Sequence, residues 1–371
     1  MKYVTLKDVC TINMGQSPDS DSYNDNGEGV PFFQGNADFG ERYPVTRKWC
    51  SAPTKMAAPE DILISVRAPI GAMNYAKEEC CIGRGLAALT PDKTKVSPKF
   101  IFWLLKGKNA ELNSKGTGST FKAIGRKVLE ETKVPDIPLE KQLEHSETLE
   151  KIYAVIQHRK SELQMLDNLI KARFVEMFNL SDCIYKSLGE CTDFVDYRGH
   201  TPELSDEGII RMVNAKSVGK GFFKYVDEFV TEETYDAWMH RGFGYPGDIL
   251  FVTEGHTFGN TCLIPEDMTK FALGQRVITI KGKEEIKNAF LCSYMQTDMF
   301  WKDINVYRTG GTAQGIRSKD LVKVMVPIPP IEQQIEFVRF VHKVDKSKVA
   351  VQKALDETQL LFDSLMQKYF G

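Results

Sequence analysis

The sequence lacks most features that mark a membrane protein, a disulfide-stabilised protein or a metalloprotein. Its eight cysteines include no Cys-x-x-Cys pair, which argues against a zinc site and favours reduced thiols. No apolar run approaches the roughly 18–20 residues that a membrane span needs. The N-terminal residues also lack the apolar core of a signal peptide. We therefore expect a cytoplasmic protein without a membrane partner.

Motifs for catalysis are also missing. Gly219-Lys220-Gly221 has neither the spacing nor the hydroxyl of a phosphate-binding loop. There is no glycine-rich cofactor loop after a strand and no Asn-Pro-Pro-aromatic tetrapeptide, the signature of amino-methyltransferases. The six histidines show no metal-ligand spacing. We expect no catalytic residue, metal site or cofactor in this chain. A net charge of −2 means that any binding of nucleic acid must come from local patches.

What the sequence does contain is a long internal repeat. Residues 118–142 and 310–334 share a glycine-rich turn and a proline-rich string that ends in glutamine. The matched pairs lie at one offset: Thr120 with Thr312, Ile124 with Ile316, Leu129 with Leu321, Gln142 with Gln334, and Phe178 with Phe370. A repeat of this length indicates two tandem units, each a globular domain followed by a long helix.

The repeat continues upstream with more divergence. The string Pro59-Glu60-Asp61-Ile62-Leu63-Ile64 matches Pro246-Gly247-Asp248-Ile249-Leu250-Phe251. Similarly, Cys81-Ile82-Gly83-Arg84 resembles Ala272-Leu273-Gly274-Gln275-Arg276. Scaffold positions agree, whereas exposed polar positions mostly differ, as is usual for loops. Two copies of one frame with different loops predict two related domains that recognise different targets.

Basic residues cluster beside the glycine-rich turn in both units. The first run contains Lys106, Lys108, Lys115, Lys122, Arg126 and Lys127, and the second contains Lys302, Arg308, Arg317, Lys319 and Lys323. Glycines let a backbone approach a phosphate closely, and lysine or arginine displaces its counterions. A solvated loop followed by a polar helix face would explain one such run equally well. Its recurrence in both units favours DNA binding.

Two uninterrupted helical runs follow the repeated segments. From Leu139 to Phe178, apolar residues recur at intervals close to a heptad pattern, without Gly or Pro. The expected packing seam is Leu149, Ile152, Ile156, Leu163, Leu166, Ile170 and Phe174, with Ile335, Val338, Phe362 and Leu365 in the second run. About 40 residues give a rod of roughly 60 Å. We favour mutual antiparallel packing of the two helices. The alternative is two separate amphipathic helices, each packed on its own domain.

The globular parts combine short strands with short helices. Residues 61–66, 85–89, 248–252 and 277–280 are short apolar runs bounded by Gly or Pro, which is typical of strands. Residues 100–105 and 289–295 have the apolar faces of helices. The predicted fold class is α+β: two tandem mixed α/β domains separated by two long antiparallel helices that form a coiled-coil spacer. The predicted boundaries are 1–137 and 183–329 for the domains, and 138–182 and 330–371 for the helices.

These motifs together resemble the DNA-specificity subunit of Type I restriction–modification systems. The resemblance rests on the Gly-Asp-Ile-Leu-like strand, the Gly-Thr-x-x-x-Ile…Leu turn and the Val-Pro-x-Pro-Pro-Ile-Glu-Gln-Gln junction, and it covers essentially the whole chain. It implies two target-recognition domains, each reading half of a bipartite asymmetric site in double-stranded DNA. It also implies that the paired helices bind two copies of a methyltransferase subunit, which holds S-adenosylmethionine. A separate restriction and translocase subunit would cut the DNA.

The resemblance further implies that the loops between the scaffold motifs face DNA. In the first unit the candidates are Gln16, Ser17, Gln34, Asn36, Arg67, Arg84, Lys115, Thr120, Lys122 and Arg126. In the second unit they are Arg198, His200, Thr201, Asn214, Lys216, His256, Arg276, Arg308, Thr312, Gln314 and Arg317. Arginine and lysine suit guanine edges or phosphates, while glutamine and asparagine suit adenine.

Two other function classes stay open at this point. A stand-alone DNA-binding regulator or anti-restriction relative would bind DNA tightly without a methyltransferase partner. A stand-alone enzyme would show activity as the purified chain. The absence of catalytic motifs favours the non-catalytic specificity subunit over both.

Overall fold

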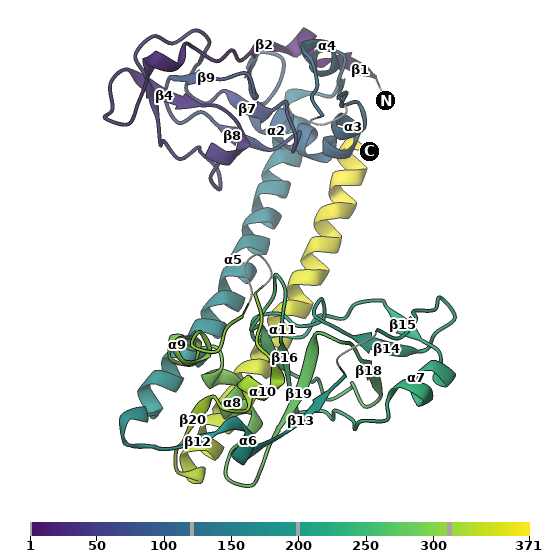
Figure 1. Ribbon diagram of the computed structural model, residues 1–371. Coiled ribbons are helices and arrows are strands. Elements are labelled where there is room, and N and C mark those ends of the chain that lie inside the picture. The colour runs from purple at the N-terminus through teal and green to yellow at the C-terminus, as the bar shows by residue number, and fades with distance from the viewer. Residues whose placement is uncertain (1, 119–121, 198–200, 310–313) are drawn as a thin grey trace. The chain divides into compact units, whose positions relative to one another are not determined.

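The computed structural model describes residues 2–118, 122–197, 201–309 and 314–371. Contacts divide the chain into two compact units (Figure 1). Unit 1 contains residues 1–160 and 353–371, and unit 2 contains residues 161–352. Each unit therefore combines one globular domain with part of each long helix. We call residues 1–137 domain 1 and residues 183–329 domain 2.

Domain 1 is a mixed α/β domain. Its strands are β1 (Tyr3–Thr5), β2 (Cys10–Met14), β3 (Tyr23–Asn24), β4 (Val30–Phe33), β5 (Trp49–Cys50), β6 (Met56–Ala57), β7 (Ile62–Ser65), β8 (Met73–Tyr75), β9 (Cys80–Ile82), β10 (Leu86–Pro91) and β11 (Lys133–Pro135). Its helices are α1 (Leu6–Val9), α2 (Pro98–Gly107), α3 (Asn109–Ser114) and α4 (Arg126–Glu130), with 3₁₀ turns at Ser20–Ser22 and Asn36–Asp38.

Domain 2 has the same plan. Its strands are β12 (Ile184–Ser187), β13 (Thr192–Asp196), β14 (Ile210–Val213), β15 (Phe229–Val230), β16 (Ile249–Val252), β17 (Thr261–Leu263), β18 (Phe271–Leu273), β19 (Val277–Gly282) and β20 (Met325–Ile328). Its helices are α6 (Leu188–Cys191), α7 (Glu232–Trp238), α8 (Asn288–Tyr294), α9 (Asp298–Ile304) and α10 (Ser318–Leu321). The predicted strands at 61–66, 85–89, 248–252 and 277–280 are confirmed as β7, β10, β16 and β19, and the two predicted short helices as α2 and α8.

The sheets repeat the same topology in both domains. An antiparallel four-stranded sheet has the order β2-β10-β7-β8 in domain 1 and β13-β19-β16-β17 in domain 2. A second sheet contains one parallel pair in each case, β4 with β9 and β14 with β18. The first and last strands of each domain pair with each other, β1 with β11 and β12 with β20. The repeat found in the sequence is thus a repeat of the four-stranded sheet, the parallel pair and the pairing of first with last strand. The second sheet differs: within the described residues it has the order β3-β5-β4-β9-β6 in domain 1 and β15-β14-β18 in domain 2.

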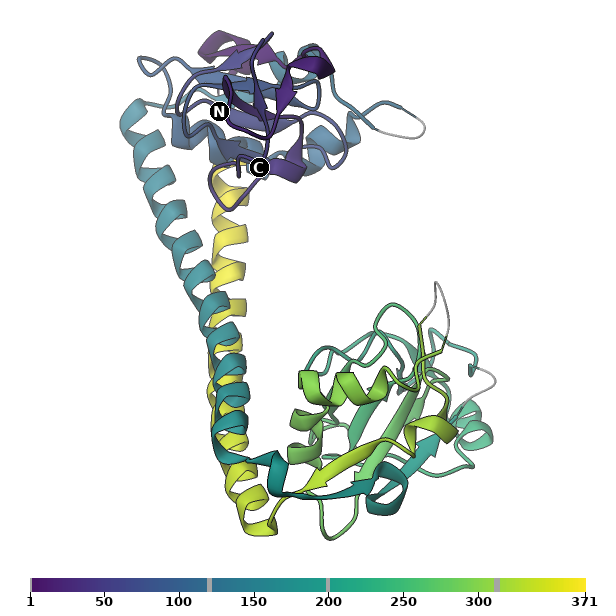
Figure 2. The ribbon, with the colours of Figure 1, turned by 60° about the vertical axis from the view of Figure 1, so that its left-hand side comes forward.

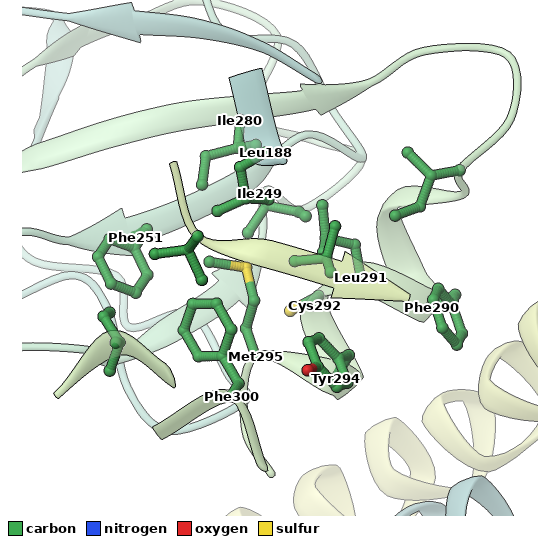
Figure 3. Close-up of a cluster of buried hydrophobic side chains, with 14 of the residues drawn as sticks. Leu188, Ile249, Phe251, Ile280, Phe290, Leu291, Cys292, Tyr294, Met295 and Phe300 are labelled. Carbon is green, nitrogen blue, oxygen red and sulfur yellow. The ribbon is translucent and has the colours of Figure 1, made fainter. Parts of the chain in front are cut away.

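Strand β16 explains why the core of domain 2 has two layers. Ile249 and Phe251 face one buried cluster, whereas Leu250 and Val252 face another, because neighbouring side chains of a strand point to opposite faces. Figure 3 shows Ile249, Phe251 and Leu188 directed toward Met295 and the side chains of α8 and α9. A strand buried on both faces has a continuous apolar sequence, which is what Ile-Leu-Phe-Val provides.

The two long helices are α5 (Leu139–Met177) and α11 (Ile331–Phe370). Within unit 2, their described parts run side by side (Figures 1 and 2), and Lys348 Nζ lies 2.7 Å from Asp167 Oδ1. Arg173 Nη2 also lies 3.2 Å from Glu336 Oε1. Residue numbers increase along α5 while the numbers of the contacting residues in α11 decrease, so the helices are antiparallel there.

In unit 1 the other parts of these helices meet in the same sense. The rings of His145 and Tyr369 stack with centroids 3.8 Å apart. Arg159 donates hydrogen bonds to the carbonyl oxygen of Ala354 and to the hydroxyl of Thr358. The end of α11 also packs on domain 1, where the Phe100 and Phe370 rings lie 5.2 Å apart. The C-terminal end of α11 is therefore part of the same compact unit as domain 1.

A buried glutamine fastens each long helix to its domain. Gln142 Oε1 accepts from the Ser97 N–H at 2.9 Å, and its Nε2 donates to the Ile137 carbonyl at 2.9 Å. Gln334 Oε1 accepts from the Lys287 N–H at 2.8 Å, and its Nε2 donates to the Pro329 and Glu285 carbonyls at 2.8 and 3.0 Å. Both side chains are fully enclosed. Their recurrence in the sequence therefore has a structural cause.

The structure corrects part of the expected seam. Leu149, Ile156, Phe174 and Phe362 are buried, and Ile152, Leu163, Leu166, Ile170, Val338 and Leu365 are half-buried. Ile335, however, is exposed, and Phe337, Val341 and Val344 are buried in its place. The reason is the buried Gln334, which fixes the rotation of the first turn of α11. Phe337, Val341 and Val344 lie three, seven and ten residues after Gln334, on the same face of the helix, and are therefore buried with it. Ile335 directly follows Gln334 and lies on a different face.

The glutamine contacts generate a stability prediction. Gln334→Ala should lower the free energy of unfolding by about 2–4 kcal/mol, because the Lys287 N–H and the Glu285 and Pro329 carbonyls lose the hydrogen bonds that Gln334 makes with them in or near the core. Urea unfolding followed by tryptophan fluorescence measures the effect. The matched control is the exposed neighbour, Gln333→Ala, for which the change should stay within about 0.5 kcal/mol. Equal unfolding midpoints for the two variants would contradict the anchoring role.

Candidate nucleic-acid interface

One edge of domain 1 gathers loop segments that are far apart in the sequence. The Gly83 N–H donates to the Phe33 carbonyl at 2.8 Å, and the Val66 N–H donates to the Gly85 carbonyl at 2.9 Å. The Ile124 N–H then donates to the Val66 carbonyl at 2.9 Å, and the Ala68 N–H to the Lys122 carbonyl at 3.0 Å. The segments after β4 and β7, before β10 and around the glycine-rich turn are therefore tied together by backbone alone.

Domain 2 builds the same edge with the same bonds. The Gly274 N–H donates to the Val213 carbonyl at 2.8 Å, and the Thr253 N–H to the Arg276 carbonyl at 2.9 Å. The Ile316 N–H donates to the Thr253 carbonyl, and the Gly255 N–H to the Gln314 carbonyl, both at 2.9 Å. Because the backbone bonds coincide, each loop position in one domain has a defined equivalent in the other.

The equivalent positions carry different side chains. The pairs are Gln34 with Asn214, Arg67 with Glu254, Arg84 with Gln275, Gly85 with Arg276, and Lys122 with Gln314. Most of these side chains are exposed. This register refines the sequence comparison, since the arginines of the two turns, Arg84 and Arg276, are not equivalent. The edge therefore has one frame and two different sets of donors and acceptors.

Gly85 shows how tightly the frame is packed in domain 1. A Cβ atom built on Gly85 would lie 2.3 Å from the Gln34 carbonyl oxygen, which real structures do not tolerate. Nearby, Gln16 donates its N–H to the Ile82 carbonyl at 3.0 Å, and the Arg84 N–H approaches Ser17 Oγ at 3.4 Å. The sequence candidates Gln16, Ser17, Gln34 and Arg84 are thus brought together.

Other candidates lie around this cluster. Lys115 and Arg126 are exposed, and each pairs with a carboxylate of its own helical segment, Glu111 at 2.6 Å and Glu130 at 3.5 Å. Asn36 is half-buried in a 3₁₀ turn, while Thr201, His256, Arg308 and Arg317 are exposed. Thr120, Arg198, His200 and Thr312 lie outside the described residues.

One lysine of the predicted basic run has a different role. The Lys106 ammonium lies 4.0 Å from the centre of the Tyr153 ring and 5.0 Å from that of the Trp103 ring. Burial lowers the pKa of Lys106. This cation–π contact joins α2 to α5 within unit 1, so Lys106 belongs to the fold and not to the interface. The clustering of basic residues in the sequence does not reveal which lysines are exposed and which pack against an aromatic ring.

Glu228 is a residue that sequence reasoning missed. Its carboxylate accepts from Asn214 Nδ2 at 2.6 Å and pairs with the Lys216 ammonium. The hydrogen bond from Lys216 lowers the pKa of Glu228. Glu228 thereby holds Asn214 and Lys216 in place and offsets the positive charge of Lys216. Its separation from them in the sequence gave no signal of this contact.

Other functional groups are sparse. Among the described residues, no set of three or more His, Cys, Asp or Glu side chains is placed to hold a metal ion. The eight cysteines, all within the described part of the chain, form no disulfide. Burial raises the pKa of Cys10 and Cys80 to about 12, so these two thiols stay protonated at neutral pH. Along the described part of the chain, no helix combines the length and apolar character that crossing a bilayer requires.

These features define a two-domain protein in which one repeated frame presents two different sets of polar side chains. The chain belongs to the family of Type I restriction modification DNA specificity domains, which matches residues 1–166 and 193–358. This result confirms the family resemblance found in the sequence.

Individual relatives agree with this assignment. The putative type I restriction enzyme MjaX specificity subunit of Methanocaldococcus jannaschii is 44% identical over 160 residues, which are 43% of this chain and 38% of that protein. The chain thus spans well under half of that relative. The type I restriction enzyme EcoBI specificity subunit of Escherichia coli is 21% identical over 99% of this chain and 85% of its own.

Solved structures share the fold. The S subunit of a Type I restriction–modification system from M. genitalium superimposes with a TM-score of 0.61 at 17% identity, covering 100% of this chain and 96% of that one. A chain from a structural study of complex assembly and conformational transition of the type I R-M system gives 0.57 at 16% identity, covering 100% and 97%. The mixed α/β architecture with two specificity domains is therefore shared.

The Glu228 cluster yields a prediction about pH. Lys216→Ala should raise the pKa of the Glu228 carboxyl toward its ordinary value, because the lysine is the largest cause of its depression. In the wild type, the stabilisation from this pair is present above the unfolded pKa of about 4.5 and is lost as pH falls through the lower folded pKa. Carboxyl NMR titration measures the shift, with Lys270→Ala as the control. An unchanged Glu228 titration in Lys216→Ala would refute the pairing.

Proposed function

We propose that this chain is the sequence-reading, non-catalytic subunit of a restriction–modification complex and that each domain reads one half of a bipartite asymmetric DNA site. One observation carries the proposal: the two domains repeat the same backbone frame at one edge and place different side chains on it. Arginine, lysine, glutamine and asparagine at that edge are the residue types that contact base edges and phosphates. Two unlike sets of such residues suit two unlike half-sites.

Partner subunits supply the chemistry in this proposal. Two copies of a methyltransferase subunit bind the helices and hold S-adenosylmethionine, and a separate restriction and translocase subunit cuts the DNA. Apolar side chains left exposed on the helices support such docking. Met165 and Leu169 of α5 are 65% and 47% exposed, and Leu360 and Leu361 of α11 are 71% and 52% exposed. Neighbouring exposed apolar residues of this size are characteristic of a protein interface.

The two helices also serve as the coiled-coil spacer that sets the gap between half-sites. Their antiparallel contacts in each unit support this role, from Arg159 with Thr358 in unit 1 to Asp167 with Lys348 in unit 2. Neither helix contains a Gly or Pro that would bend it. A stiff pair of helices is what a ruler requires.

The direct test is to co-express the chain with the neighbouring genes of its genome and to map methylated bases by single-molecule sequencing. A bipartite asymmetric methylated site that depends on this chain supports the proposal. Tight sequence-specific binding by the chain alone, with no methylation in the presence of the neighbours, would indicate a stand-alone regulator instead. Methylation or cleavage by the purified chain would indicate an enzyme.

The ruler role predicts a change in the gap. Four residues inserted after Gln164 in α5 and four after Ala350 in α11, both close in sequence to the Asp167–Lys348 ion pair of unit 2, lengthen both helices by about 6 Å. Since one base pair spans about 3.4 Å, the gap should grow by one or two base pairs while both half-sites stay the same. Methylome mapping reads out the gap. Insertions of two residues rotate each helix by about 200° and should abolish assembly. Full activity with an unchanged gap would contradict the hypothesis that the helices set the distance between the half-sites.

Docking can be tested separately. Met165→Glu combined with Leu169→Glu should abolish co-purification of the methyltransferase subunit, because two charges replace exposed apolar contacts on one helix face. The matched control is Gln164→Glu with Asn168→Glu, which adds the same charge to neighbouring polar positions. Each domain should stay folded in both variants, because the changed residues lie outside the domain cores. Retained methyltransferase binding in the first variant would place the docking surface elsewhere.

A further inference from the structure

An exposed ion pair stands at the candidate edge of domain 2. Arg276 Nε donates to Glu254 Oε1 at 3.1 Å, and the two side chains are 55% and 57% exposed. Exposed pairs of this kind add little to stability, because water screens both charges. The fold of domain 2 therefore does not require Glu254 and Arg276 to be a carboxylate and a guanidinium.

The backbone nevertheless places both residues with precision. Thr253, just before Glu254, donates its N–H and its hydroxyl to the Arg276 carbonyl at 2.9 and 3.2 Å. Gly255, just after Glu254, donates its N–H to the Gln314 carbonyl at 2.9 Å. Both neighbours of Glu254 are thus fixed, and its carboxylate holds the guanidinium through Nε. The printed hydrogen bond and ion pair of Arg276 use Nε, and its terminal nitrogens Nη1 and Nη2 form no hydrogen bond or ion pair with any described residue.

Domain 1 has neither residue at the equivalent positions. Arg67 occupies the position of Glu254, and Gly85 occupies that of Arg276. A side chain at position 85 is excluded, because its Cβ would lie 2.3 Å from the Gln34 carbonyl oxygen. The same frame therefore offers a carboxylate–guanidinium pair in domain 2 and separate arginines in domain 1. If the two domains prefer different bases, their equivalent positions have to carry different side chains, as they do here.

We propose that Arg276 reads a guanine in the half-site of domain 2 and that Glu254 is the positioning residue that aims its guanidinium. The inference rests on the proposed DNA-reading function. A guanidinium edge with two free nitrogens donates a bidentate pair of hydrogen bonds to guanine O6 and N7. A carboxylate beside it repels the phosphate backbone and so favours the base edge. The charge-assisted bond to Nε fixes the plane of the guanidinium before DNA binds.

The experiment selects bound sequences from a random double-stranded DNA library with the full-length chain co-purified with its methyltransferase subunits, for the wild type and for Arg276→Ala, Arg276→Lys and Glu254→Gln. Arg276→Ala should reduce the preference for guanine at one position of one half-site by roughly 10- to 100-fold and leave the other half-site unchanged. Arg276→Lys should lose most of that preference, because an ammonium keeps the charge but not the planar fork. Glu254→Gln should weaken the preference at the same position by a smaller factor.

The matched control is Lys270→Ala. Lys270 forms an exposed ion pair with Glu232 at 2.7 Å in the same domain, but it precedes β18, at the end of that strand opposite the candidate edge. This variant should select the wild-type sequence. Binding by Arg276→Ala that falls equally for all sequences, with a shallower salt dependence, would make Arg276 a phosphate contact and overturn the proposal.

The proposed function and this inference are overturned by different results. A wild-type complex that selects no sequence would overturn the proposed function together with this inference. A wild-type chain that selects a bipartite sequence, combined with an Arg276→Ala variant that selects the same one, would overturn this inference alone. A preference for cytosine that disappears in Glu254→Gln but survives in Arg276→Lys would reverse the two roles and also overturn it.

Discussion

The architecture of each unit depends on one buried amide at the start of a long helix. Gln142 and Gln334 each join the helix to two segments of the preceding domain through backbone groups that would otherwise be unpaired. A buried amide with all of its partners satisfied is highly directional, whereas apolar packing alone tolerates rotation. The glutamine therefore fixes both where the helix begins and which face turns inward. In α11 the buried stripe of Phe337, Val341 and Val344 follows from that first turn.

A rigid backbone frame also explains how recognition can change without changing the fold. At the candidate edge, the bonds that the two domains share run between main-chain atoms, so these shared bonds do not depend on the side chains. A substitution at an exposed position of this edge changes the hydrogen-bonding groups that the edge presents. It leaves the free energy of folding nearly unchanged, because exposed side chains contribute little to folding. The exception is Gly85, where the frame itself occupies the space of a side chain. The frame thus determines which positions are free to vary in each domain.

The sequence predicted the parts of the fold that are local or repeated. Continuous apolar runs such as Ile249–Val252 predicted buried strands, and the Gln142–Gln334 match predicted a repeated junction. It failed where long-range contacts decide. Ile335 fits the helical pattern as well as Phe337 does, and only the distant Lys287 N–H, bonded to Gln334, sets the phase of the helix. Backbone bonds to β4 and β14 fix which turn residues are equivalent and place Arg84 opposite Gln275, so that Arg276 has Gly85 as its counterpart.

Charge at the candidate edge is balanced at some positions and not at others, and this has a consequence for binding. Lys115, Arg126, Lys216 and Arg276 each lie within an ion pair with a nearby carboxylate, whereas Arg67, Arg84 and Lys122 are exposed and have no ion pair with any described residue. The chain as a whole carries −2, so attraction to phosphates has to come from such local unpaired positions. An ion-paired side chain adds little net charge, and what it offers DNA is a positioned donor whose contribution depends on the base sequence. The edge therefore combines positions suited to phosphates with positions suited to base edges, which is the combination that a sequence-reading surface needs.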